Sequence, residues 1–294
     1  MQTYSERIDR AARLLAEADC LLIGAGAGLS AGAGLNYQDE ALFKEWYPLF
    51  ASLGIRTIWE GVTAHWAPND ANRRRFWAFW ATHIQKIRYE APAGQVYLDL
   101  RSLVDKQKHF VITTNVDGQF VKAGFDPAQL YTPQGDYGLF QCATPCSDAL
   151  YDNREMVQRM LAHMDQQALE IRETDIPRCP NCGGYLERNL RIDSRFVEKP
   201  HLRKQGDYLE FIKQSAGGKL ILLELGVGFN TPVIIRYPFE RIASLHPGAA
   251  LIRVNLDNPE VPQPIAAKSI GFPENSAKVL QDLLMRLAAG DSLP

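Results

Sequence analysis

The segment Cys20-Leu21-Leu22-Ile23-Gly24-Ala25-Gly26-Ala27-Gly28 joins a short apolar run to a glycine-rich turn. Four consecutive apolar residues are too few for a core helix and suit a strand that is buried on both faces. Glycines directly after such a strand permit a tight turn into a helix and let the backbone approach a ligand closely. The segment therefore predicts the first strand and the nucleotide-binding turn of an α/β domain.

Similar apolar runs recur along the chain, with helical stretches or long insertions between them. They lie at residues 110–112, 220–225 and 250–254, with a weaker run at 130–131. Thr3 and Glu6 form a capping box that predicts a first helix over about residues 4–17, and a last helix is expected from Ser276 to Leu287. Strands that alternate with helices, without two-residue hairpin turns, predict a Rossmann-like, doubly wound parallel sheet.

Two insertions interrupt this alternation. Residues 37–95 have little strand signal and hold all five tryptophans, which are Trp46, Trp59, Trp66, Trp77 and Trp80. Aromatic residues at this density predict a small helical module whose side chains pack on one another. Its triplet Arg73-Arg74-Arg75 is interpreted as a solvated helix face, although it could also dock an acidic partner. The second insertion, residues 136–195, is bounded by cysteine pairs. The remaining segments, 1–36, 96–135 and 196–294, form the discontinuous Rossmann-like domain.

The cysteine pairs predict a metal site. Cys142 and Cys146 form the first pair, and Cys179-Pro-Asn-Cys182-Gly-Gly forms the second. Thiolates on two tight turns can wrap a tetrahedral Zn²⁺, and four sulfur ligands leave no open position, which is typical of a structural site. A redox pair at Cys179 and Cys182, or four reduced thiols without metal, are the alternatives. Cys20 opens a buried strand and is expected to be a core residue.

Composition excludes several classes of protein. The 294 residues are 46% hydrophobic and 22% charged, with a formal net charge of −2. No basic excess indicates a nucleic-acid partner, and no apolar run of about 18 residues exists that could span a membrane. The N-terminal sequence is charged and helical from its start, unlike a signal peptide. We therefore expect a cytoplasmic protein, in which cysteines serve metals or catalysis more often than disulfides.

Three further motifs follow in order along the chain. They are Thr113-Thr114-Asn115-Val116-Asp117-Gly118, then Pro133-Gln134-Gly135, and Leu225-Gly226-Val227-Gly228 after the fourth strand. Together with the glycine turn and the cysteine pairs, this order resembles the sirtuins over essentially the whole chain. The resemblance implies that NAD binds between a Rossmann-like domain and a smaller zinc-bearing domain.

The resemblance also implies roles for individual residues. The glycine turn is similar to the pyrophosphate loop, and Asn115 and Asp117 match the pair that holds the nicotinamide ribose and carboxamide. Gly226 and Gly228 match the segment near the adenosine phosphates, and Asn255 matches the asparagine at the adenosine ribose. The implied cofactor-binding residues are Gly24, Ala25, Gly26, Gly28, Leu29, Tyr37, Thr114, Asn115, Val116, Asp117, Gly226, Val227, Gly228, Asn230, Asn255, Leu256 and Asp257.

Several positions depart from the deacylating sirtuins. Gln134 stands where they carry a histidine, Thr114 replaces a glutamine, and Tyr37 replaces an arginine. Their Phe-Gly-Glu segment is Phe196-Val197-Glu198 here. These changes resemble the class M sirtuins, which are associated with macrodomain proteins. That pattern implies transfer of ADP-ribose to a lipoylated glycine-cleavage H-like carrier protein, with a macrodomain hydrolase in the same pathway.

The change at Gln134 alters the expected chemistry. Cleavage of the bond between nicotinamide and ribose needs positioning and electrostatics, which Asn115 and Asp117 could supply. Deacylation then needs a general base, a task that suits histidine but not a glutamine amide. An aspartate or glutamate acceptor is already ionised at neutral pH and needs no base. The sequence therefore predicts NAD-dependent mono-ADP-ribosyl transfer to a carboxylate, with Asn115, Gln134 and Asp117 as the catalytic residues and NAD consumed.

Three rival functions stay open. A vestigial, non-catalytic NAD or ADP-ribose sensor would also lack the histidine, although it has less use for Asn115 and Asp117. A deacylase could recruit one of the six histidines, which otherwise are interpreted as surface or packing residues. A dehydrogenase needs an acidic residue after a second strand, but residues 42–47 are aromatic and helical in pattern. The acceptor residue and the oligomeric state are not encoded in any recognisable motif.

Overall fold

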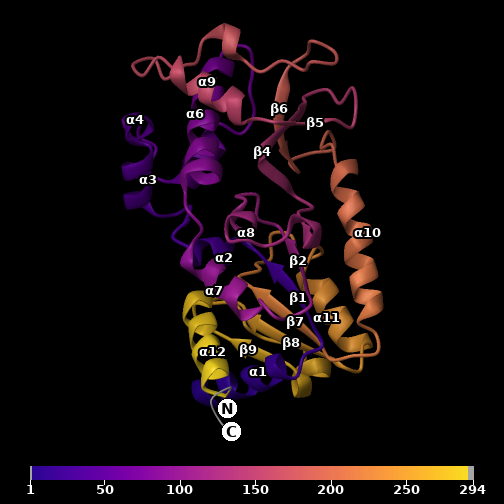
Figure 1. Ribbon diagram of the computed structural model, residues 1–294. Coiled ribbons are helices and arrows are strands. Elements are labelled where there is room, and N and C mark those ends of the chain that lie inside the picture. The colour runs from indigo at the N-terminus through magenta and orange to yellow at the C-terminus, as the bar shows by residue number, and fades with distance from the viewer. Residues whose placement is uncertain (1, 291–294) are drawn as a thin grey trace.

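The computed structural model describes residues 2–290 and contains a six-stranded parallel sheet with the strand order β3-β2-β1-β7-β8-β9 (Figure 1). Its strands are β1 (Cys20–Ala25), β2 (His109–Thr113), β3 (Leu130–Tyr131), β7 (Leu220–Leu225), β8 (Ala249–Val254) and β9 (Ile270–Phe272). The predicted Rossmann-like fold is therefore confirmed. Sequence reasoning missed β9, which has only three residues and a central glycine.

Helices cover both faces of this sheet (Figure 1). On one face lie α1 (Tyr4–Ala16), α7 (Gln95–Leu103) and α12 (Ser276–Gly290), packed on Ile23, Leu223 and Ile252. On the other lie α10 (Lys199–Gln214) and α11 (Arg236–Leu245), packed on residues that alternate with the first set. Because successive strand residues point to opposite faces and both faces are covered, the strands are mostly apolar along their whole length, with Glu224 on β7 and Arg253 on β8 as buried exceptions.

The first insertion is helical. It contains α3 (Glu40–Trp46), α4 (Pro48–Ala51), α5 (Ile58–Ala64), α6 (Arg73–Ile84) and a π-helix, η1 (Gln85–Glu90). Trp77 and Trp80 are buried, whereas Trp59 and Trp66 are 52% and 47% exposed. The expected aromatic packing is therefore restricted to part of the module.

The second insertion carries a small antiparallel sheet with the order β5-β4-β6. Its elements are β4 (Gly135–Cys142), β5 (Leu150–Asp152), α9 (Arg154–Ala162), η3 (Glu173–Asp175) and β6 (Leu186–Leu190). Short helices complete the described chain: α2 (Ala27–Gly32), α8 (Gln119–Lys122), η2 (Pro127–Gln129) and η4 (Gln263–Lys268).

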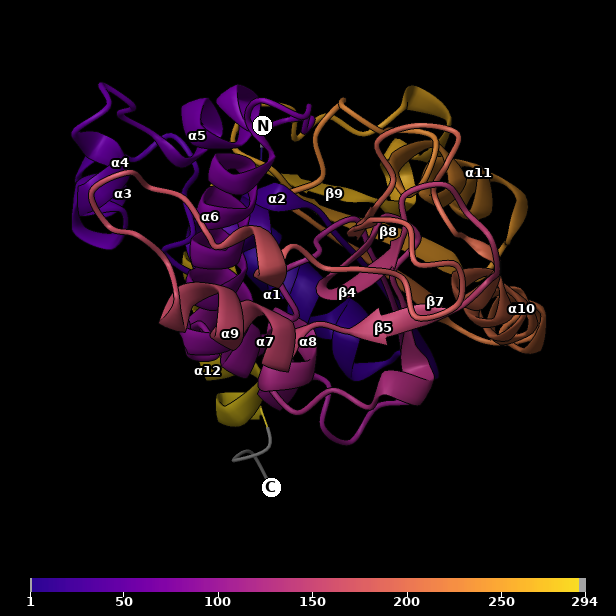
Figure 2. The ribbon, with the colours of Figure 1, turned by 90° about the horizontal axis from the view of Figure 1, so that it is seen from above.

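The two insertions share one hydrophobic core, in which α6 lies beside α9 (Figure 2). The ring of Trp77 on α6 contacts Phe140 on β4 with centroids 4.9 Å apart. Arg74 and Arg75 are half-exposed, and both pair with Glu170, Arg74 at 3.0 Å. The arginine triplet is therefore not a freely solvated face, because it fastens the second insertion to the first. The sequence-based domain boundaries stay a prediction.

Among the helices of residues 2–290, none combines the length and the apolar character needed to cross a bilayer.

Candidate functional site

The glycine turn brings the ends of β1 and β7 together. A Cβ atom on Gly26 would lie 2.7 Å from the carbonyl oxygen of Gly226, and one on Gly28 would lie 2.7 Å from the Gly226 Cα. Gly226 itself has a φ of +60°, which favours glycine. The N–H of Gly28 donates to the Gly226 carbonyl at 3.0 Å. Any larger residue at these positions would push the two loops apart.

Two cavities flank this turn at the carboxyl ends of the strands, where open α/β sheets bind ligands. We call them the Asn115 cavity, of about 380 Å³, and the Asn255 cavity, of about 250 Å³. Ala27, Gly28 and Thr114 line both. The Asn115 cavity also holds the predicted residues Tyr37, Asn115, Val116 and Asp117. The Asn255 cavity holds Gly26, Gly226, Val227, Gly228, Asn230, Asn255, Leu256 and Asp257.

The remaining predicted residues line neither cavity. Gly24 and Ala25 lie within β1, and Leu29 is buried in the core beneath the sheet. Gln134 is partly buried directly before β4, and its carbonyl accepts a hydrogen bond from the Arg191 N–H at 3.0 Å. Of the six histidines, all within the described residues, none lines either cavity.

Asn115 follows β2 and is held in place by three oxygen atoms. Its Nδ2 lies 3.0 Å from each of the Gly26 carbonyl, the Ser30 hydroxyl and the Tyr97 hydroxyl. Ser30 and Tyr97 were missed by sequence reasoning. Ser30 lies two residues after Gly28, in the stretch of small residues that continues to Gly34, so its place in the loop was a usable signal. Tyr97 on α7 lies in no recognised motif.

Asp117 is buried beside this group. Its Oδ2 accepts the Ser30 hydroxyl at 2.6 Å, and its Oδ1 accepts the Gln119 N–H at 2.9 Å. Burial raises the pKa of Asp117, and the hydrogen bonds from Ser30 and Gln119 oppose that rise. The two hydrogen bonds therefore favour the ionised carboxylate in a site that otherwise disfavours charge.

Aromatic hydroxyls form another part of the Asn115 cavity wall. Tyr37 Oη lies 3.1 Å from Tyr137 Oη and 3.3 Å from His83 Nε2, and the other imidazole nitrogen lies 2.9 Å from Tyr47 Oη. His83 is fully buried, which lowers its pKa to about 3, and burial raises the pKa of Tyr137 to about 12. The imidazole and the Tyr137 phenol are therefore neutral at pH 7. Neither His83 nor Tyr137 belongs to a sequence motif that we identified.

Asn255 positions the loops of its cavity. Its Nδ2 donates to the Val227 carbonyl at 2.8 Å, and its Oδ1 accepts the N–H groups of Asp257 and Asn258 at 3.0 Å. Beneath the cavity, Arg253 on β8 donates to Glu224 on β7 at 2.7 Å, and both side chains are fully buried. Burial raises the pKa of Glu224 despite this partner.

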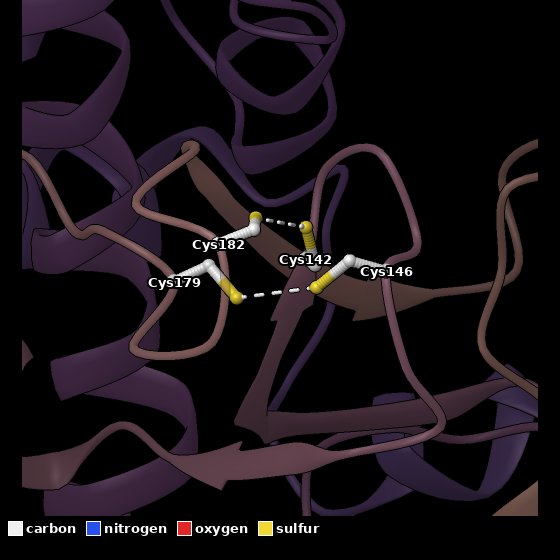
Figure 3. A group of neighbouring side chains, drawn as sticks. All are labelled: Cys142, Cys146, Cys179 and Cys182. Atoms are coloured by element: carbon white, nitrogen blue, oxygen red, sulfur yellow. Dashed lines mark hydrogen bonds between the residues drawn. The ribbon is translucent and has the colours of Figure 1, made fainter.

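The four paired cysteines lie together at the far end of the small sheet (Figure 3). Their sulfur atoms all lie within 4.8 Å of one another, with Cys142–Cys182 and Cys146–Cys179 both at 3.6 Å. A tetrahedral Zn²⁺ with bonds of about 2.3 Å separates its sulfur ligands by about 3.8 Å. Burial acts to raise the pKa of Cys179, but the N–H groups of Cys182 and Asn181 lower it to about 6. The donor set therefore fits a structural zinc ion.

The paired cavities also fit an extended dinucleotide. They meet at the glycine turn, where only residues without a Cβ atom fit between the ends of β1 and β7. One cavity contains the carboxylate and amide of Asp117 and Asn115, and the other contains the amide of Asn230 and the carboxylate of Asp257. Such an arrangement can hold a ligand with a polar group at each end and a charged middle.

Comparisons with known proteins support this description. No family model matches the chain. It is 32% identical over 270 residues to the protein ADP-ribosyltransferase of Staphylococcus aureus strain Mu50, covering 91% of this chain and 84% of that protein. It is 32% identical over 250 residues to a probable bifunctional ADP-ribose hydrolase/ADP-ribosyltransferase of Fusarium oxysporum f. sp. cubense, covering 82% of this chain and 41% of that protein. A solved Sir2 enzyme structure shares the fold with a TM-score of 0.60 at 21% identity, covering 97% of this chain and 99% of that one.

Proposed function

Because this chain belongs to the sirtuin family and is an NAD-dependent protein ADP-ribosyltransferase, we propose that it transfers a single ADP-ribose to a carboxylate side chain of a lipoylated glycine-cleavage H-like carrier protein. The choice of a carboxylate as the acceptor rests on a single observation, which is that neither cavity is lined by a histidine. A nucleophile that must first lose a proton would lack a base, whereas a carboxylate arrives ionised.

His83 does not supply the missing base. It reaches the Asn115 cavity only through the Tyr37 hydroxyl, and its pKa of about 3 makes it a very weak proton acceptor at pH 7. His201 Nε2 donates to Asn189 Oδ1 at 2.7 Å, and burial lowers the pKa of His201 too. Gln134 carries an amide, which orients by hydrogen bonding and cannot take up a proton.

In the proposed reaction, Asn115 and Asp117 hold the nicotinamide end of NAD in the Asn115 cavity. The glycosidic bond between nicotinamide and ribose C1′ breaks, and its electron pair leaves with nicotinamide. The acceptor carboxylate oxygen forms the new bond to C1′, so no proton is transferred. Asp117 favours the cationic sugar electrostatically, and the buried hydrogen bonds of Asn115 fix that amide before the substrate binds.

The carrier protein is proposed from the class M sequence pattern and not from a surface of this molecule. The test is to incubate the protein with NAD and one of three acceptors: the lipoylated carrier, the same carrier without lipoate, or an acetyl-lysine peptide. Nicotinamide release and intact carrier mass are measured together. We expect nicotinamide release with a matching mass gain on the lipoylated carrier. Neutral hydroxylamine should then remove the ADP-ribose, because it cleaves an ester to a carboxylate but not a glycosidic bond to serine.

Two variants make the result specific. Asn115→Ala should abolish nicotinamide release while the protein keeps its thermal stability within a few degrees. Gln134→His should raise deacetylation of the peptide, because it restores a base that deacylation needs, whereas a deacylase with a substitute base predicts only a slight rise. NAD binding without any nicotinamide release would instead identify a sensor, and efficient deacetylation by the unaltered protein would identify a deacylase. Either outcome contradicts the proposal.

A further inference from the structure

Four polar side chains form one wall of the Asn115 cavity and the layer behind it: Tyr47, His83, Tyr37 and Tyr137. Tyr47 lies between α3 and α4, His83 is on α6, Tyr37 is in the loop before α3, and Tyr137 is on β4. Three contacts connect them in a line, from the Tyr47 hydroxyl to His83, from His83 to the Tyr37 hydroxyl, and from there to the Tyr137 hydroxyl. Tyr37 and Tyr137 line the cavity, whereas Tyr47 and His83 are buried behind it.

The line has more hydrogens than internal contacts. A neutral imidazole has one N–H donor and one acceptor nitrogen, and each phenol carries one O–H. The four groups therefore bring four donor hydrogens to three contacts. Each contact uses one hydrogen, so one hydrogen is left without an acceptor inside the line.

Burial decides where the remaining hydrogen lies. The Tyr47 hydroxyl has His83 Nδ1 as its one recorded partner among residues 2–290 and is 1% exposed. A buried hydroxyl hydrogen without an acceptor is costly, so Tyr47 donates to Nδ1. The imidazole hydrogen is then on Nε2 and is donated to Tyr37. The unused hydrogen consequently belongs to Tyr37 or Tyr137, and both hydroxyls lie at the cavity.

We propose that the Tyr37–Tyr137 pair, with His83 as its positioning residue, donates this hydrogen bond to the carboxamide oxygen of nicotinamide in the Asn115 cavity. The inference rests on the proposed function, which places nicotinamide there. A carboxamide presents an N–H₂ donor as well as an oxygen acceptor, and Asp117 supplies the acceptor for the former. The tyrosine pair supplies the complementary donor, so both halves of the amide are recognised.

The ligand test uses direct binding to the full chain in the presence of ADP-ribose, measured by calorimetry with nicotinamide and with 3-methylpyridine, which lacks the carbonyl. In the double variant Y37F/Y137F we expect nicotinamide to bind about 3- to 10-fold more weakly and 3-methylpyridine to bind unchanged. Each single variant keeps one phenol hydrogen and should lose less than the double variant does.

Tyr47→Phe is the matched control, because it removes a hydroxyl from the same line but leaves the hydrogen at the cavity. It should lower the melting temperature and change nicotinamide affinity by less than about 2-fold. An unchanged nicotinamide affinity in the double variant, or an equal loss for both bases, would overturn the proposal. A lack of carrier labelling would contradict the proposed acceptor, but it would not affect the interpretation of these binding measurements.

The tautomer of His83 can be measured in the unaltered protein, which provides a second, independent test. Long-range ¹H–¹⁵N correlation spectra of the intact protein distinguish the two imidazole tautomers. We expect the hydrogen on Nε2. A hydrogen on Nδ1 would be donated to Tyr47, would direct the Tyr37 hydrogen toward His83, and would leave no donor for the cavity, which contradicts the proposal.

Discussion

Replacing Ser30 with alanine tests how hydrogen bonding favours the ionised form of the buried Asp117. The Ser30 hydroxyl donates to Asp117 Oδ2 at 2.6 Å, and both residues are buried, so solvent does not readily replace this bond. A hydrogen bond to a charged group contributes about 1.5–3 kcal/mol. Its loss removes a contribution that lowers the pKa of Asp117, so the pKa rises further above its ordinary value.

The sign of the effect follows from which form is active. Ionised Asp117 favours the cationic sugar, so activity is lost as the pH falls through the pKa, and a higher pKa moves that loss to higher pH. At a pH on the acid limb of both profiles, the ionised fraction, and with it kcat/KM for nicotinamide release, should fall about 10- to 150-fold in Ser30→Ala. At high pH the two proteins should differ much less.

The assay is the pH dependence of kcat/KM for nicotinamide release, with Tyr97→Phe as the control. The Tyr97 hydroxyl contacts Ser30 and Asn115, at 2.8 Å and 3.0 Å, but has no recorded hydrogen bond to Asp117. Removing the Tyr97 hydroxyl should lower kcat/KM without changing the pH at which activity is lost on the acid side of the profile. If Ser30→Ala lowers the rate equally at every pH, the argument that Ser30 acts through the Asp117 carboxylate is refuted.

Three further predictions address the rest of the molecule. Gly28→Ala should weaken NAD binding about tenfold or more in calorimetry, because the added Cβ would lie 2.7 Å from Gly226. Gly206→Ala on α10 is the control and should leave NAD binding unchanged, because its added Cβ would meet nothing within 4 Å. Equal NAD affinities of the two variants would contradict the steric argument. Arg253→Leu should lower the free energy of unfolding in urea by about 3–5 kcal/mol, because the buried Glu224 then keeps only the longer contact to Arg236 at 3.6 Å. A loss below about 1 kcal/mol, typical of exposed pairs, would show that the Arg253–Glu224 pair contributes little. A zinc chelator should remove hydrogen-exchange protection from residues 142–186 before the six-stranded sheet is affected, and simultaneous loss in both would show that the cysteine site supports the whole fold.

The sequence was sufficient wherever a structural rule acts over neighbouring residues. Four or more apolar residues in a row predicted β1, β7 and β8, and the spacing of Cys179 and Cys182 predicted a metal turn. β9 escaped because Ile270-Gly271-Phe272 is too short to show a pattern, and it is held by pairing with Ile252 and Val254 on β8. The strand exists through its neighbour and not through its own propensity.

The candidate site was predictable only in part for the same reason. Asn115 and Asp117 stand in a motif, but their partner Ser30 lies 85 and 87 residues away in the chain. His83 reaches Tyr37 across 46 residues, and Tyr137 reaches it across 100. No local pattern encodes such contacts, because they arise only when the helical insertion folds back over the end of the sheet. The position of Gln134 outside both cavities was likewise invisible to spacing.

The eight-residue strand β4 connects the cysteine site with the Asn115 cavity. β4 begins next to Gln134, carries Tyr137 at the cavity, and ends on Cys142 of the cysteine site. The pairing of β4 with β6 is regular from Phe140 to Cys142 and irregular between Gly135 and Phe140. The cysteine site and Tyr137 at the cavity wall nevertheless share this strand, so a displacement of Cys142 can reach the wall that faces nicotinamide. Zinc binding would then affect the geometry of the Asn115 cavity as well as the stability of the small sheet. Metal-depleted protein should therefore be catalytically impaired while still folded.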